Sequence, residues 1–68
     1  MSNPKVIIVN TVLGSQIIAV DNIARVESWG GGGSKIILKE VKNGSNVELL
    51  TSTSPGNVLQ LMTAASAD

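Results

Sequence analysis

The chain has 68 residues, a formal net charge of zero, and neither cysteine nor histidine. Disulfide scaffolds, thiol nucleophiles, cysteine or histidine zinc sites and imidazole acid–base chemistry are therefore excluded. Five basic residues balance five acidic ones, which argues against a polycation that grips phosphate backbones. One tryptophan without tyrosine or phenylalanine is too little for a base-stacking platform.

Aliphatic residues are abundant for so short a chain. Hydrophobic residues make up 43% of the sequence and charged residues 15%. A domain of this size buries only about 60% of the surface that its unfolded chain exposes. We therefore predict that the chain associates with copies of itself. The apolar run at residues 6–9 is too short for a signal-peptide core or a membrane span, so a cytoplasmic protein without membrane contact is expected.

Five segments have the composition of β-strands: residues 6–9, 16–20, 23–29, 35–42 and 45–51. The first is β-branched throughout and apolar on both faces, which favours a strand covered on both sides. A turn is predicted at Gly14-Ser15. Asp21-Asn22 predicts a second turn, or a kink if the second and third segments form one strand. Residues 30–34 predict a flexible glycine-rich loop.

Asn43-Gly44 is the strongest turn signal, because a type I′ turn requires positive φ at both central residues. The turn predicts a register in which Lys42 faces Ser45, Lys39 faces Glu48, Leu38 faces Leu49 and Ile37 faces Leu50. One opposite-charge pair and two aliphatic pairs would then lie across the hairpin, each contributing about 0.2–1 kcal/mol.

A helix is predicted at about residues 55–65. Ser54 suits the N-cap, and Pro55 suits the first helical position, where its missing N–H costs nothing. An apolar stripe is expected to contain Val58, Leu59, Leu61, Met62 and Ala65.

These elements predict a single α+β domain over residues 1–68, an antiparallel β-meander of four to five short strands with one C-terminal amphipathic helix. One helix covers only one face of a sheet. Because several strands are apolar on both faces, we expect a second copy to cover the other face, which makes the protein a homo-oligomer.

The glycine run invites comparison with a phosphate-binding loop. Such a loop has glycine directly before lysine and a helix after it, whereas here Ser34 precedes Lys35 and a strand follows. The run is interpreted as a connection between strands, with an engineered spacer as the alternative.

No constellation of residues predicts catalysis. The carboxylates Asp21, Glu27, Glu40, Glu48 and Asp68 are interpreted as solvated charges, and the serines and threonines have no general base beside them. We expect no catalytic, cofactor-binding or metal-binding residue, no cofactor and no enzymatic activity.

Three residues are candidates for contact with a partner: Trp29, Ile37 and Leu50. Trp29 ends a strand beside the glycine run. It can anchor a partner, or pack against the helix or a seam between copies, and packing is favoured because tryptophan is usually mostly buried. Ile37 and Leu50 are expected on the second, uncovered face of the sheet.

The order of elements resembles that of the small flagellar FlbD-like proteins. The resemblance spans roughly residues 6–62 and is carried by Gly14, Val20, Ile23, Val26, Glu27, Ile36, Leu38, Gly44, Val47, Ser54, Val58 and Met62. The long glycine loop and the nearly uncharged helix depart from that family's pattern. The resemblance implies the fold and carries over no catalytic residue. Small neutral bacteriophage proteins are also similar in length and composition.

The sequence therefore favours a non-enzymatic, self-associating structural or interaction module, whose expected partner is itself, with another protein as a second partner class. The alternative is a small regulatory protein associated with nucleic acid, in which oligomerisation gathers Lys35, Lys39 and Lys42. The neutral charge makes nucleic acid the less favoured partner.

Overall fold

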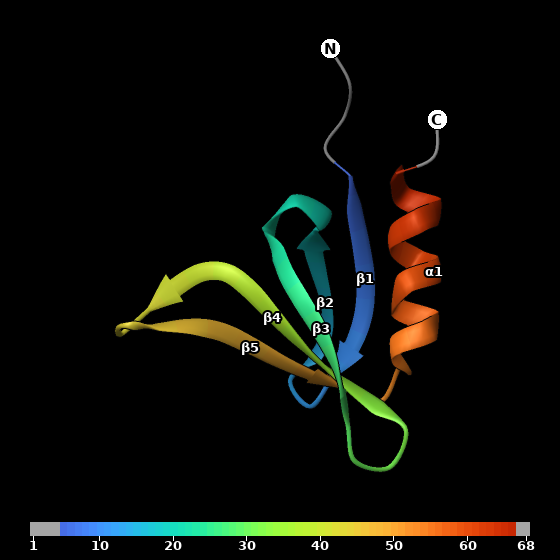
Figure 1. Ribbon diagram of the computed structural model, residues 1–68, viewed down its shortest axis with the longest axis horizontal. Helices are drawn as coiled ribbons and strands as arrows, with labels where there is room; N and C mark the ends of the chain where they lie inside the picture. Colours follow the sequence, from blue (N-terminus) through green and yellow to red (C-terminus); the bar gives the residue numbers. More distant parts are fainter. Residues whose placement is uncertain (1–4, 67–68) are drawn as a thin grey trace.

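The computed structural model, which describes residues 5–66, contains one five-stranded antiparallel sheet and a C-terminal helix (Figure 1). The strands are β1 (Val6–Thr11), β2 (Gly14–Ala19), β3 (Ile23–Trp29), β4 (Gly33–Lys42) and β5 (Ser45–Thr51). Their order in the sheet is β2-β1-β5-β4-β3. The predicted α+β class is confirmed. Consecutive strands pair except β2 and β3, which lie at opposite edges, and β1 instead meets β5, so the strand order departs from the predicted meander at this connection.

The hairpin of β1 and β2 turns two residues earlier than predicted. Its turn consists of Val12 and Leu13, and Gly14 with a φ of 105° already opens β2, so the predicted turn at Gly14-Ser15 is wrong. The Thr11 side chain closes this turn. Its Oγ1 donates to the Gly14 carbonyl (2.9 Å) and accepts from the Leu13 N–H (3.1 Å). Two aliphatic residues can therefore occupy the turn and remain exposed.

A short 3₁₀ turn, η1 (Val20–Asn22), separates β2 from β3. The predicted turn at Asp21-Asn22 is confirmed. Because the chain changes direction there, β2 pairs with β1 while β3 pairs with β4.

The glycine run is shorter as a loop than predicted. Gly30, Gly31 and Gly32 form the turn, whereas Gly33 and Ser34 belong to β4 and are buried. A Cβ atom on Gly33 would collide with the carbonyl oxygen of Thr51. Ser34 is fully buried, and its Oγ donates to the Thr53 carbonyl (2.6 Å). Both residues are thus part of the sheet because β4 and the end of β5 approach closely there.

The hairpin of β4 and β5 has the predicted turn and a different register. Asn43 (φ 56°) and Gly44 (φ 81°) both have positive φ, and Lys42 faces Ser45 as predicted. Beyond Val41 the register shifts, so that Ile37 faces Glu48, Ile36 faces Leu49, and Lys35 faces Leu50. The predicted Lys39–Glu48, Leu38–Leu49 and Ile37–Leu50 pairs are therefore wrong. β4 is three residues longer than β5, and the irregularity takes up two of these extra residues, because residues 38–40 of β4 lie opposite Val47 alone.

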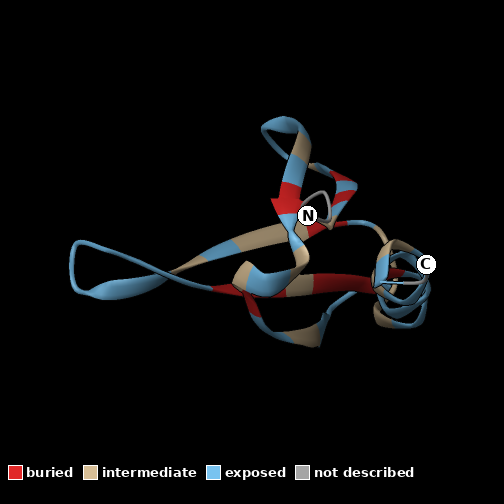
Figure 2. Cartoon of the chain, turned by 90° about the horizontal axis from the view of Figure 1, so that it is seen from above, coloured by how far each residue is buried: buried red, intermediate tan, exposed pale blue. Residues whose placement is uncertain are grey.

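The end of this hairpin, residues 39–46, projects from the body as an exposed arm (Figure 2). At the base of the arm, beside the register irregularity, the Asn46 Nδ2 donates to the Leu38 carbonyl (2.9 Å). Leu38 on the body side of that bond is 6% exposed, whereas Val41 on the arm is 62% exposed. The core therefore ends at the irregularity.

The helix α1 spans Pro55–Ser66, close to the predicted bounds. Ser54 caps it as predicted, because its Oγ accepts from the Asn57 N–H (3.3 Å). Val58 is fully buried, and Met62 and Ala65 pack against the core. Leu59 (62% exposed) and Leu61 (38% exposed) lie outside the contact, so the buried stripe is narrower than predicted.

The core lies between the β1–β2 hairpin, the strands β3 and β4, and α1. Its buried members are Ile7, Val9, Ile18, Ile23, Ile36, Leu38 and Val58. The helix contacts β1, β3 and β4 and thereby closes the open side of the curved sheet (Figure 1). The side chains of this core are all aliphatic, so the contacts among them are contacts of close packing.

The burial of the helix predicts the effect of two neighbouring substitutions. Val58→Ala removes two buried methyl groups, so we expect the free energy of unfolding to fall by about 2 kcal/mol. Leu59→Ala, on the exposed side of the same helix, should change it by less than about 0.5 kcal/mol. Urea denaturation followed by circular dichroism, at one protein concentration, measures both. Equal effects would mean that α1 docks in another orientation.

Candidate interaction surfaces

The outer face of β3, β4 and β5, turned away from the core, carries charged and apolar side chains in a grid. Residues that face each other across antiparallel strands share a face of the sheet. Arg25, Ile37 and Glu48 form one row of this grid. Glu27, Lys35 and Leu50 form the next row.

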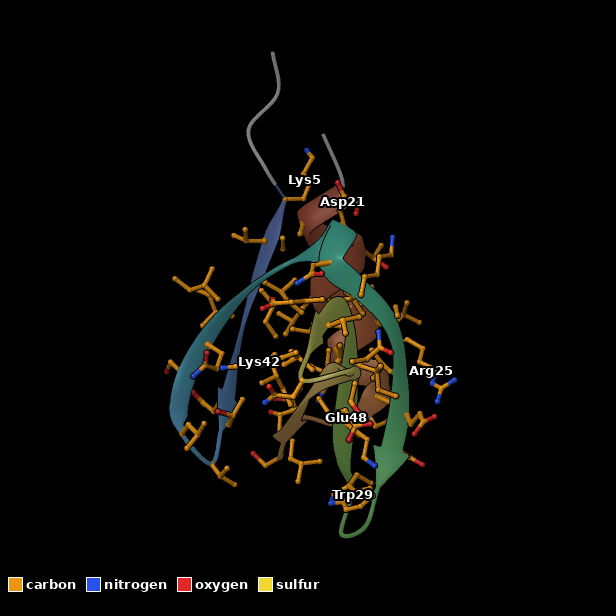
Figure 3. All side chains as sticks on the ribbon, turned by 90° about the vertical axis from the view of Figure 1, so that its left-hand side faces the viewer. Lys5, Asp21, Arg25, Trp29, Lys42 and Glu48 are labelled. Atoms are coloured by element: carbon orange, nitrogen blue, oxygen red, sulfur yellow. The ribbon has the colours of Figure 1, made fainter. Side chains whose placement is uncertain are left out.

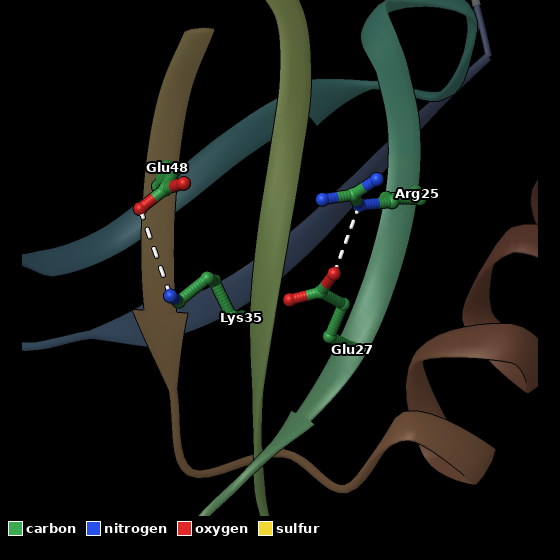
Figure 4. A network of polar contacts seen from close by, with 4 residues as sticks. All are labelled: Arg25, Glu27, Lys35 and Glu48. Atoms are coloured by element: carbon green, nitrogen blue, oxygen red, sulfur yellow. Dashed lines mark ion pairs between the residues drawn. The ribbon is translucent and has the colours of Figure 1, made fainter.

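Two ion pairs connect the charges of this face (Figure 4). Arg25 Nε lies 2.9 Å from Glu27 Oε2, and Lys35 Nζ lies 3.8 Å from Glu48 Oε1. The side chains of Arg25, Glu27 and Glu48 remain 67%, 43% and 51% exposed. Each pair therefore contributes at most about 1 kcal/mol. The four charges cancel, so this face offers no net charge to a partner.

Ile37, a predicted contact residue, is 7% exposed. It lies outside the main core cluster, in a row between Arg25 and Glu48. In the single chain Ile37 is thus buried on the outer face and offers little area for direct contact. In the observed register Ile37 faces Glu48, whereas the predicted register had put Leu50 opposite it.

Trp29, the second predicted contact residue, lies at the end of β3 beside the glycine turn (Figure 3). The Lys35 Nζ lies 4.1 Å from the centroid of its ring, a cation–π contact worth about 0.5–1 kcal/mol at an exposed site. The ring is still 49% exposed. Trp29 therefore packs against a neighbouring side chain and also presents much of its surface to solvent.

Trp29 and Leu50 come together at a shallow hollow of about 430 Å³. Besides β3 with Trp29 and β5 with Leu50, the end of β1 and the start of β4 also line this hollow. The lining residues are Asn10, Thr11, Val12, Trp29, Gly30, Gly31, Gly33, Leu50, Thr51 and Ser52. Among these described residues none carries a titratable side chain, so the hollow offers an aromatic wall and hydroxyl groups without an acid or base. Contact with a ligand or peptide is chemically possible there, and proton transfer by the lining side chains is not.

A second surface is the outer face of β1 and β2, which consists of Val6, Ile8, Ile17 and Ala19 and is called the aliphatic face below. Ile8 and Ile17 face each other across the two strands and are 60% and 71% exposed. Val6 and Ala19 form the adjacent pair. The turn next to it exposes Val12 (85%) and Leu13 (82%). Exposed aliphatic residues grouped on one hairpin are typical of an association surface.

The residues of the aliphatic face were not among the predicted contact residues. The signal for them was the run at residues 6–9, which is apolar on both faces although only one face can meet the core. Ile7 and Val9 enter the core, whereas Val6 and Ile8 remain outside.

The lysines required by the nucleic-acid alternative lie in two places. Lys35 contacts Glu48 and Trp29 on the outer face, and its side chain is 20% exposed. Lys39 and Lys42 lie on the exposed arm, with Glu40 between them. A single chain therefore does not bring the three lysines together.

Metal-binding groups do not gather in residues 5–66: the structure holds no cluster there of three or more acidic, histidine or cysteine side chains. In the same part of the chain, no helix has the length and apolar character needed to cross a membrane.

Comparison of the chain with protein-family models, curated proteins and solved structures gives no match. The resemblance to FlbD-like proteins and the likeness to bacteriophage proteins stay predictions.

Gly30 and Gly33, which both line the hollow, provide a matched test of the close approach of β4 and β5. Gly33→Ala places a Cβ against the Thr51 carbonyl oxygen, so we expect it to lower the free energy of unfolding by at least about 2 kcal/mol. Gly30→Ala meets no atom within 4 Å and needs no positive φ, so its effect should stay within about 0.5 kcal/mol. Thermal or urea unfolding compares them. If both glycines tolerate alanine equally, β4 and β5 do not approach as described.

Proposed function

We propose that this protein is a non-enzymatic interaction module that works as a self-associated assembly, in keeping with the cytoplasmic location expected from its sequence. The observation that carries the proposal is the Ile8–Ile17 pair, which lies outside the core with more than half of each side chain exposed. The one helix is already used on the opposite side, where Val58 enters the core. Within residues 5–66 no element covers the aliphatic face, and a second copy of the chain is always present to do so.

The energetics support association through this face. Full burial of an isoleucine side chain contributes about 1.5–3 kcal/mol. Each copy brings two such residues, together with Val6, to an interface that includes this face. No charged residue belongs to the aliphatic face, so copies would meet there without repulsion or loss of charge hydration.

Self-association is favoured over the nucleic-acid alternative because of where the cations lie. Lys35 is engaged by Glu48 and Trp29, and Glu40 offsets part of the charge of the arm. Affinity for oligonucleotides that falls with rising salt would reverse this preference.

The proposal predicts the size of the particle in solution. At micromolar concentrations, sedimentation equilibrium should give at least twice the 7.0 kDa chain mass. The double variant Ile8→Thr/Ile17→Thr keeps β-branched residues in both strands and removes apolar area, so it should shift the particle toward the single-chain mass.

Val41→Thr is the matched control, because Val41 is equally exposed (62%) and β-branched but lies on the arm. It should associate like the unaltered chain. A monodisperse 7.0 kDa species of the unaltered chain throughout this range would contradict the proposal.

A further inference from the structure

The two edge strands of the sheet, β2 and β3, differ in their protection against pairing with another strand. β3 carries Arg25 and Glu27, and its register with β4 is irregular between Ile23 and Arg25. Charges and irregularities of this kind prevent an edge from accepting a further strand. β2, with the sequence GSQIIA, has no charge, no proline and an unbroken register with β1. One edge is therefore guarded and the other open.

The hydrogen bond from the Val20 N–H to the Lys5 carbonyl (2.9 Å) fixes which backbone groups of β2 face the open edge. In an antiparallel ladder, facing pairs alternate between exchanging both hydrogen bonds and exchanging none. With Val6 facing Ala19, this bond makes Val6–Ala19 and Ile8–Ile17 pairs of the second kind. The N–H and C=O groups of Ser15, Ile17 and Ala19 consequently point away from β1.

We propose that β2 pairs antiparallel with β2 of a second copy, about a two-fold axis at Ile17. This proposal rests on the self-association proposed above and names its geometry. In this register Ile17 faces itself, and Ser15 faces Ala19 of the partner subunit, so the outward groups of all three residues find partners. A strand without charge is compatible with its own copy, because no like charges come to lie opposite each other.

The same pairing extends the aliphatic face. Ile8 and Ile17 lie in one row of the β1–β2 hairpin, and the two-fold axis continues that row into the second copy. Four isoleucines then stand side by side across the joint sheet, in cross-strand contact. Backbone pairing and apolar contact would therefore act in one interface.

A proline at residue 19 tests the backbone pairing separately from the aliphatic face. Ala19 has a φ of −68°, which proline adopts, and its N–H is not used by the β1–β2 ladder. Ala19→Pro thus removes an outward donor and leaves the isoleucines in place. We expect the dissociation constant of the dimer to rise at least about tenfold, since symmetry removes a donor from each copy. Ala19→Ser keeps the donor and should dimerise like the unaltered chain.

The results separate the two proposals. If the unaltered chain dimerises and Ala19→Pro dimerises equally well, the strand pairing is overturned while self-association stands. If the unaltered chain is a single-chain species, both are overturned. Circular dichroism must show that Ala19→Pro retains the fold for the comparison to count.

A cysteine at the axis gives a second measurement that does not depend on proline. The chain has no cysteine, so Ile17→Cys introduces one thiol that the two-fold axis places beside its copy. Facing strand residues have Cα atoms about 5.5 Å apart, within the range that a disulfide spans. Mild oxidation should therefore crosslink Ile17→Cys much faster than Val41→Cys on the exposed arm. Equal crosslinking rates would overturn the pairing, even if Ala19→Pro fails to fold.

Discussion

The fold depends on a buried polar junction where β1, β4, β5 and the entry to α1 meet. Thr51 faces Ser34 on one side and Thr11 on the other, and this last pair joins β1 to β5 in the described sheet. The Ser34 hydroxyl reaches the Thr53 carbonyl (2.6 Å), and the Thr51 Oγ1 accepts from the Thr53 N–H (3.2 Å). Buried polar groups are costly unless paired, so these bonds hold the strands and the start of the helix in one arrangement.

This junction determines which side of the sheet the helix α1 covers. The junction brings β1 against β5, and α1 starts directly after it. Val58 is thereby placed over a core that the β1–β2 hairpin shares with the strands β3 and β4. The outer face of β1 and β2 then has no element within residues 5–66 left to shield it, since the helix is already engaged on the inner side. The elements of this part of the chain thus leave both the aliphatic face and the edge of β2 uncovered.

Local signals predicted the elements well, and long-range packing decided the rest. Asn43-Gly44 and Ser54-Pro55 define a turn and a helix start through their own backbone preferences, and both are confirmed. The register of β4 beyond Val41 depends on strands distant in sequence, so the Lys39–Glu48 pairing could not be excluded from the turn alone. Of the three predicted contact residues, Trp29 and Leu50 share one hollow, whereas Ile37 is buried on the outer face. The turn at Val12 and Leu13 was missed because Thr11, and not a residue of the turn, stabilises it.

The register irregularity in β4 divides one strand into two segments of different local stability. On the body side, Ile36, Ile37 and Leu38 are buried, and opening the chain there exposes the core. On the arm, both strands are solvated and lack a third strand, and such ribbons are marginal by themselves. Amide protons at the end of β4 should therefore exchange with solvent through local fraying, while those near its start require global unfolding. The arm can bend or melt without cost to the rest of the molecule, and the amide of Asn46, bonded to the Leu38 carbonyl, marks where that freedom ends.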